Sequence, residues 1–157
     1  MDTMMADPTQ LTDADYVVAL LIAVGLGALI GLERRLRGHA GGMHLNALVA
    51  LGAAAYVIAA TLYNDDATAP GRVAGQVVTG VGFLCAAFIF QRGGAVRGIN
   101  TAATVWCSAA VGVLCGMALT LWAVIVAALV LATNVILHFV EHRMEAAKPP
   151  APPPPSA

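Results

Sequence analysis

Charge is scarce in this sequence. Asp, Glu, Lys and Arg make up 11% of the 157 residues, whereas hydrophobic residues make up 59%. A soluble domain typically has about 25% charged and roughly 45–50% apolar residues. Residues 98–140 contain no charged side chain. Since a membrane-spanning helix needs about 20 apolar residues, this stretch is long enough for two passes that fold back as a hairpin. The shortage of charge therefore argues against a soluble protein and predicts one embedded in a lipid bilayer.

Several functional signatures are also missing. The formal net charge is −1 and no basic run is interleaved with aromatics, so we expect no nucleic acid partner. The three cysteines lie in apolar segments without the CxxC or Cys/His spacing of a metal site, and we expect neither a metal nor another cofactor. No GxSxG, HExxH or phosphate-binding loop motif occurs, and no base adjoins Cys107. We therefore expect that the protein is not an enzyme.

Charges and turn residues divide the apolar sequence into five candidate helices. The predicted fold class is an all-α membrane protein, a bundle of five transmembrane helices. The loop at 63–71 is a firm boundary because its Pro-Gly pair cannot continue a helix, whereas length alone separates the last two helices. The predicted helices span residues 16–32, 44–62, 73–90, 101–117 and 120–139. They form a domain over 16–139, preceded by an acidic segment at 1–15 and followed by a Pro-rich tail at 140–157, which we interpret as a spacer.

The basic residues fall almost entirely on one side of this five-helix arrangement. Only Arg72 lies on the side opposite to the other Lys and Arg residues. Because positive charge is retained on the cytoplasmic side, we expect an external N-terminus and a cytoplasmic C-terminus. The N-terminal segment carries several Asp residues and no basic residue before Arg34, the reverse of a signal peptide, so we expect the first helix to remain as an anchor.

Small and polar residues indicate where helices meet. Gly27 and Gly31 form a GxxxG step in the first helix. A second stripe of small residues, on the third helix, consists of Gly75, Thr79, Gly82 and Ala86. Small side chains let helices approach closely in a membrane, so both stripes predict helix packing, with a subunit interface as the alternative. We interpret Gln76 and Asn134 as hydrogen-bonding groups between helices, with contact to a substrate as the alternative.

The densest group of polar residues lies at the predicted cytoplasmic edge. Glu33 ends the first helix among arginines, and the loop after the third helix carries Arg92 and Arg97. An interfacial carboxylate facing guanidinium groups can join two loops through paired hydrogen bonds, so we expect Glu33 to pair with the arginines of that loop. A hydrated cation held by Glu33 is the alternative, which the positive neighbours disfavour.

Three blocks of the sequence form a recognisable set. Residues 27–34 read GALIGLER, and residues 46–54 read NALVALGAA. The third block comprises 77–84 with 89–90, and 96–112, the last of which reads VRGINTAATVWCSAAVG. The blocks resemble the GxLIGLER, NALVALGAA, GxGFLGAGxIF and VRGLxTAATxWCSAAVG motifs of the MgtC/SapB family of bacterial inner-membrane proteins. Together they are specific and cover residues 27–116.

The resemblance implies a five-helix domain in the bacterial inner membrane, in agreement with the helix count above. It also implies a link to growth at low magnesium and a regulator that binds membrane partners, including the F-type ATP synthase, rather than a magnesium carrier. By this resemblance, the residues expected to take part in docking or packing are Glu33, Arg34, Asn46, Arg97, Asn100, Thr101, Thr104 and Cys107.

The sequence departs from the family pattern in the third helix, at two places near the predicted edge, and at its end. Cys85 and Ala87 replace family glycines in the third helix, so we expect looser or shifted packing there. Gly42-Met43-His44-Leu45 stands where many members have Gly-Leu-Arg-Thr, and Arg92 stands where the loop usually has an acidic residue. A binding role of that loop carboxylate is therefore not carried over. The chain also ends soon after the fifth helix, so the short form without a soluble C-terminal domain is the nearer comparison, and virulence is not carried over.

The residues and the resemblance together predict a non-enzymatic membrane regulator that docks on another membrane complex and affects magnesium or membrane-potential homeostasis. The lack of a carboxylate in the middle of the spans disfavours a proton-coupled carrier. The alternative is a small transporter or channel for an ion or small solute, in which a homo-oligomer encloses a pathway. That pathway would be lined by Gln76, Thr79, Asn134 and Glu33.

Overall fold

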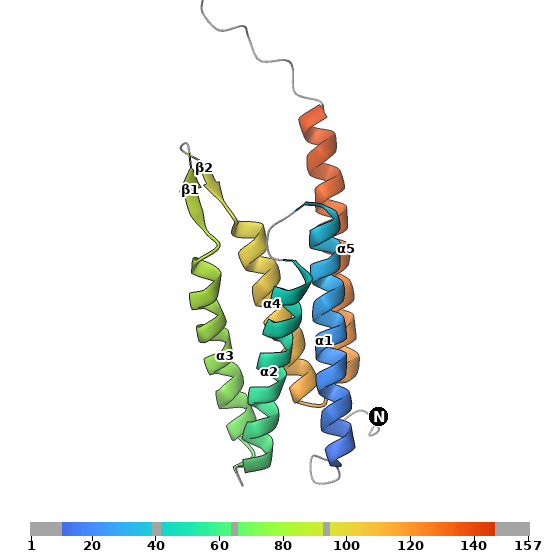
Figure 1. Ribbon diagram of the computed structural model, residues 1–157, viewed down its shortest axis with the longest axis vertical. Coiled ribbons are helices and arrows are strands. Elements are labelled where there is room, and N and C mark those ends of the chain that lie inside the picture. The colour runs from blue at the N-terminus through green and yellow to red at the C-terminus, as the bar shows by residue number, and fades with distance from the viewer. Residues whose placement is uncertain (1–10, 39–41, 64–65, 93–94, 147–157) are drawn as a thin grey trace, which may run out of the picture.

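A computed structural model describes residues 11–38, 42–63, 66–92 and 95–146, except for the side chains of residues 92, 141, 142 and 144–146. Within these ranges the chain is a bundle of five helices with one small β-hairpin (Figure 1). The helices are α1 (Asp13–Leu36), α2 (Met43–Tyr63), α3 (Ala69–Ala86), α4 (Ile99–Gly116) and α5 (Thr120–Ala146). The hairpin pairs β1 (Phe90–Arg92) with β2 (Ala95–Arg97) in antiparallel fashion. Most of the acidic segment and of the Pro-rich tail lies outside the described residues.

Four of the described helices have the length and composition of membrane spans. These are α1, α2, α4 and the part of α5 over Thr120–Val140. Their apolar side chains are abundant on the outside as well as in the core, as at Leu21 and Leu129, which are 66% and 61% exposed. Exposed apolar faces of this extent suit a surrounding of lipid rather than water.

The third helix starts and ends earlier than predicted. The sequence indicated a helix at 73–90, but α3 begins at Ala69, so Pro70 and Gly71 of the predicted loop lie in its first turn, where the missing N–H of proline is tolerated. α3 ends at Ala86, and Phe90 already belongs to β1. Beyond the helix, the N–H groups of Ala87, Phe88 and Ile89 donate to carbonyls three residues back, at 3.1–3.2 Å. These tight turns end the helix and lead directly into β1 of the hairpin. A left-handed Gly98 (φ 89°) then packs against the Phe88 carbonyl, where no side chain would fit.

The turn between the last two helices has a clear geometric cause. Ala118 adopts φ 59°, and the N–H of Leu119 donates to the carbonyl of Leu114 at 2.9 Å. A left-handed residue followed by such a backward hydrogen bond ends a helix and satisfies its last carbonyls. α5 therefore turns back along α4, and it packs on both α4 and α1.

The Gly27 and Gly31 step makes the close contact that the sequence indicated. A methyl group added at Gly27 would lie 2.6 Å from the carbonyl oxygen of Asn46, and one at Gly31 would lie 2.6 Å from the Cα of Met43. Gly112 and Gly116 of α4 approach the backbone of α2 in the same way. α1, α2 and α4 are thus held together at backbone distance, as small residues allow.

The small-residue stripe on the third helix does not pack within the bundle, contrary to the prediction. Gly75, Thr79 and Gly82 are exposed, and a methyl group added at either glycine would meet nothing within 4 Å. α3 instead contacts α2 and α4 through the opposite side, where Val77, Val81 and Cys85 are buried against Val105 and Ala109. The small residues do lie on one face of α3, but the opposite face, with Val77 and Val81, is the one that packs against the core.

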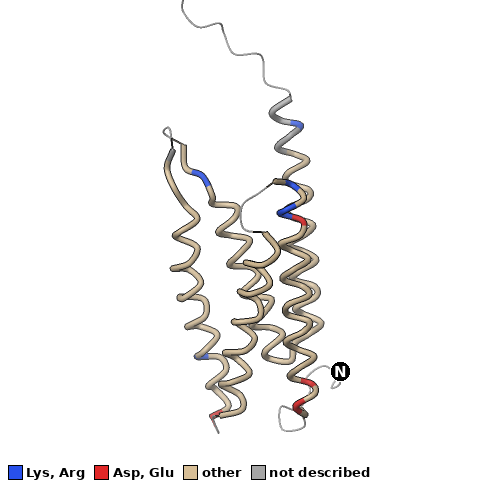
Figure 2. Tube along the Cα trace, in the orientation of Figure 1, with Lys and Arg blue, Asp and Glu red and all other residues tan. Residues whose placement is uncertain are grey.

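Charged residues gather at the two ends of the bundle and leave its middle free of charge (Figure 2). The end of α1 that carries Glu33, Arg34 and Arg37 lies at the same end of the bundle as the hairpin with Arg97 and the start of α4 (Figure 1). The opposite end carries Asp13 and Asp15 of α1, and Asp66 with its ion-pair partner Arg72 at the start of α3. We call the first of these the arginine-rich end.

Candidate functional site

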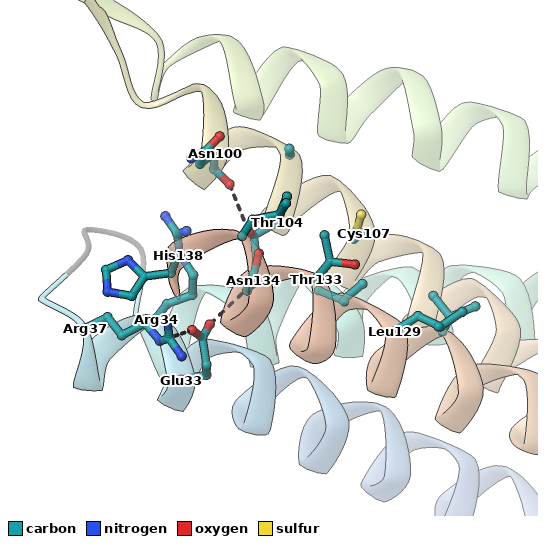
Figure 3. A pocket seen from close by; sticks show the side chains of 14 residues that line it. Glu33, Arg34, Arg37, Asn100, Thr104, Cys107, Leu129, Thr133, Asn134 and His138 are labelled. Atoms are coloured by element: carbon teal, nitrogen blue, oxygen red, sulfur yellow. Dashed lines mark hydrogen bonds and ion pairs between the residues drawn. The ribbon is translucent and has the colours of Figure 1, made fainter. Parts of the chain in front are cut away.

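A polar pocket opens at the arginine-rich end, between α1, α4 and α5 (Figure 3). Its volume is about 390 Å³. α1 supplies its charged residues, α4 supplies a row of small and polar ones, and α5 supplies mainly apolar ones. The lining residues are Glu33, Arg34, Arg37, Asn100, Ala103, Thr104, Cys107, Val126, Leu129, Val130, Thr133, Asn134, Leu137 and His138.

Glu33 joins α1 to α5 within this pocket. Its carboxylate forms an ion pair with Arg37, one turn further along α1, and accepts a hydrogen bond from Asn134 Nδ2 at 3.3 Å (Figure 3). The two charged side chains are largely buried, at 13% and 22% exposure. The expected pairing of Glu33 with the loop arginines is wrong for Arg97, because the carboxylate is turned toward its own helix and α5; the side chain of Arg92 lies outside the described part of the chain.

Arg34 joins α1 to α4. Its side chain is 5% exposed, and its Nη2 donates to the hydroxyl of Thr101 at 2.7 Å. Its Nε has no hydrogen-bond partner among the residues that the structure describes. The adjacent Glu33 carboxylate acts on Arg34 through its charge, but among the described residues no carboxylate is hydrogen-bonded to this guanidinium. A buried guanidinium without such a bond is unusual.

The α4 side of the pocket follows helical spacing. Asn100, Thr104 and Cys107 lie on one face of α4, at steps of four and three residues. The hydroxyl of Thr104 donates to the carbonyl of Asn100 at 2.8 Å, so it is satisfied within its own helix. The thiol of Cys107 is half-buried and lies opposite the α5 residues that include Thr133 (Figure 3).

Asn46 belongs to a different polar contact, in the core between α2 and α4. Asn46 and Ser108 are both 0% exposed, and the Ser108 hydroxyl donates to Asn46 Oδ1 at 2.8 Å. Asn46 Nδ2 in turn donates to the carbonyl of Gly42 at 3.2 Å. The pair gives α2 and α4 a specific register in an otherwise apolar interface.

The structure thus brings together most of the residues indicated by the sequence. Glu33, Arg34, Asn100, Thr104 and Cys107 line the pocket, and Thr101 bonds to Arg34. Asn46 lies in the neighbouring core, and Arg97 is exposed on the hairpin.

Sequence reasoning missed the contribution of Arg37 and His138 to this site. The four-residue step from Glu33 to Arg37 was a signal of a helical ion pair. The same step from Asn134 to His138 places both side chains on one face of an otherwise apolar helix.

The channel pathway suggested by the sequence is not formed within one chain. Gln76 and Thr79 lie on the exposed side of α3, whereas Glu33 and Asn134 lie in the pocket between α1 and α5. α3 packs on α2 and α4, which separate it from that pocket. Among the described residues, no group of three or more His, Cys, Asp or Glu is arranged to hold a metal ion.

Apolar helices of spanning length, with a charged pocket at one end, define a helical membrane protein. The family model described as MgtC family matches residues 20–143. Protein MgtC of Salmonella typhimurium (strain 14028s / SGSC 2262) is 45% identical over 129 residues, which cover 82% of this chain and 55% of that protein. Protein MgtC of Brucella abortus (strain 2308) is 51% identical over 113 residues, covering 72% of this chain and 47% of that protein.

The chain therefore belongs to the MgtC family. It spans about half the length of the curated relatives that it matches. No solved structure matches it.

Proposed function

We propose that this protein is a non-enzymatic regulator in the bacterial inner membrane, which docks on another membrane complex and influences magnesium or membrane-potential homeostasis. The family resemblance makes the F-type ATP synthase a candidate partner. The relatives' shared name, Protein MgtC, supports the family-level assignment and leaves the regulatory role as our proposal.

We further propose that all five helices cross the membrane, with the N-terminus outside and the C-terminus in the cytoplasm. α3 is as long as α4, at 18 residues, but it is not among the four helices apolar enough to be candidate spans. It nevertheless runs alongside α2 and α4 (Figure 1). Arg34, Arg35 and Arg37 lie at the same end as Arg97, at the predicted cytoplasmic side. Positive charge at that end supports this orientation.

The observation that carries the regulator proposal is the close-packed interior. The half of the core away from the arginine-rich end consists of small apolar side chains, including Ala54, Val111 and Cys115, all 0% exposed. Most of the buried polar side chains lie at the end of α1 or in the first two turns of α2 and α4. Ser108 is also buried, and it is hydrogen-bonded to Asn46 in the first turn of α2. A solute crossing a single copy of the chain would have to break this core, so a docking role fits the geometry better than transport.

The proposal is tested by isolating the full chain, tagged at its C-terminus, in mild detergent from cells grown with and without magnesium. We expect one membrane complex to co-purify in constant ratio from the starved cells. A tagged multi-pass protein of similar size provides the control. The proposal fails if no partner is enriched over that control under starvation.

Flux measurements separate the regulator from the transporter alternative. Proteoliposomes containing the purified protein are loaded with a magnesium-sensitive dye, and a second set with a potassium-sensitive dye. We expect the same leak as in empty liposomes. A protein-dependent flux that saturates with ion concentration would contradict the regulator proposal and support an oligomeric pathway.

A further inference from the structure

The pocket between α1, α4 and α5 has two chemically different parts. Toward the end of the bundle it is lined by Glu33, Arg34 and Arg37 with Asn100. Toward the middle of the bundle it is lined by the apolar α5 residues Val126, Leu129 and Val130. Such a division matches an amphipathic ligand, with a polar group at the membrane surface and a hydrocarbon part below it.

The charge in the polar part favours an anion. The charged lining residues are two arginines and one glutamate, and the glutamate is already bonded to Arg37 and Asn134. Arg34 bonds only to a neutral hydroxyl among the described residues, and its Nε is without a partner there. Burial of a cation is costly unless an opposite charge accompanies it, and the Glu33 carboxylate that acts on Arg34 is already ion-paired with Arg37. A further anionic group beside Arg34 would therefore stabilise the site.

The start of α4 adds to this preference. Its first residue follows Gly98, which provides no side-chain cap. The first N–H groups of a helix have no partner within the helix, and they carry a partial positive charge that attracts phosphate groups. Asn100, in that first turn, lines the pocket.

The pocket is also open to the region that lipid would occupy. Leu129 and Leu137 line it from α5, and they are 61% and 53% exposed. Ala103 borders it from α4 and is exposed as well. A volume of about 390 Å³ holds a headgroup and the upper part of a chain, and the rest of a lipid would lie along the outer surface of α5.

We propose that this pocket binds an anionic phospholipid, with its phosphate between Arg34, Arg37 and the start of α4, and an acyl chain along Leu129 and Val130. Basic pockets between membrane helices on the cytoplasmic side are known to hold such headgroups. The site recognises a phosphodiester, and its apolar lower part selects a lipid over free phosphate. The inference concerns what the pocket holds and does not depend on the regulator proposal.

The test measures lipid binding to the purified full chain in detergent, by native mass spectrometry and by thermal stabilisation. The probes are phosphatidylglycerol, phosphatidylcholine of the same chain length, and inorganic phosphate. We expect binding of one phosphatidylglycerol in preference to phosphatidylcholine, and no competition by phosphate at millimolar concentration. Equal binding of both lipids would overturn the proposal. Competition by phosphate would overturn it in favour of a free-anion site.

Two variants, each with a matched control, locate the site. Arg37→Gln should weaken phosphatidylglycerol binding about tenfold, which corresponds to about 1.4 kcal/mol, because it removes a charged hydrogen-bond donor to the phosphate. Arg35→Gln is the matched control, because Arg35 is exposed at the same end and does not line the pocket. Equal losses in the two variants would show a general surface attraction and contradict the proposal.

The second pair of variants tests the apolar part without changing charge. Ala103→Leu places bulk in the pocket and should also weaken binding, whereas Ala128→Leu, on the exposed side of α5 outside the pocket, should not. Unchanged binding in Ala103→Leu would overturn the placement of the acyl chain. Both alanines are exposed, so folding is expected to survive these changes, and this pair decides the outcome even if Arg37→Gln fails to fold.

Discussion

At the scale of single residues, the contact between Asn46 and Ser108 gives the clearest energetic expectation. Ser108→Ala removes the hydroxyl that donates to Asn46 Oδ1 at 2.8 Å in a fully buried interface. Hydrogen bonds between helices in membranes contribute about 0.6 to 2 kcal/mol, so we expect a loss of this size in the free energy of unfolding. Thermal unfolding in detergent measures it.

A matched hydroxyl provides the control for this change. Ser108 also lies within hydrogen-bond distance of the Thr104 carbonyl in its own helix, at 3.1 Å. Thr79 donates in the same way to the carbonyl of Gly75, at 3.2 Å, but its side chain is exposed. Thr79→Ala should leave the unfolding temperature nearly unchanged. If both variants lose the same stability, the contact between Asn46 and Ser108 is not a specific link between α2 and α4.

Glu33 provides a second residue-scale prediction, because its partner differs from the one expected. Glu33→Gln should weaken the contact of α1 with α5 and lower the unfolding temperature in detergent. Exchanging Glu33 and Arg37 within one chain keeps an ion pair and should restore part of the loss, whereas exchanging Glu33 and Arg97 should not. Restoration by the Arg97 exchange alone would contradict the observed ion pair.

At the scale of helices, two glycines on opposite faces of α1 are expected to respond differently to the same substitution. A methyl group at Gly27 would lie 2.6 Å from the Asn46 carbonyl, whereas one at Gly25 would meet nothing within 4 Å. Gly27→Ala should therefore separate α1 from α2 and cost about 1–3 kcal/mol. Gly25→Ala should be neutral or slightly stabilising, because alanine favours a helix over glycine.

Unfolding in detergent again provides the measurement, and the comparison within one helix removes the effect of helix propensity. Gly82→Ala on α3 extends the test, since its surroundings are also open. We expect it to resemble Gly25→Ala. A large loss at Gly82 would indicate that the small-residue face of α3 is covered in the membrane.

The helices could be predicted from the sequence because apolar length and charge are local properties. The hairpin could not, since strands as short as Phe90–Arg92 and Ala95–Arg97 carry no detectable periodicity. The pocket was only half predictable. Spacing placed Asn100, Thr104 and Cys107 on one face of a helix, but no spacing relates Glu33 to Asn134, which lies 101 positions away. That pairing depends on how α5 packs against α1.

At the scale of the whole molecule, the arrangement of α3 decides how the chain crosses the membrane. Ala67 lies in the loop before α3, and Val96 lies in the hairpin after it; both are exposed. If α3 crosses the membrane, these positions face opposite sides. If it does not, they face the same side.

Single cysteines at these two positions answer the question, in a chain whose Cys85, Cys107 and Cys115 are replaced by alanine. A maleimide that cannot cross membranes should label Ala67→Cys in intact spheroplasts and Val96→Cys only after the membrane is opened. The reverse labelling pattern would contradict the proposed orientation, in which Arg34, Arg35, Arg37 and Arg97 lie on the cytoplasmic side. Labelling of both positions from outside would mean that α3 does not cross the membrane. The positively charged hairpin would then lie on the external side, contrary to the positive-inside rule.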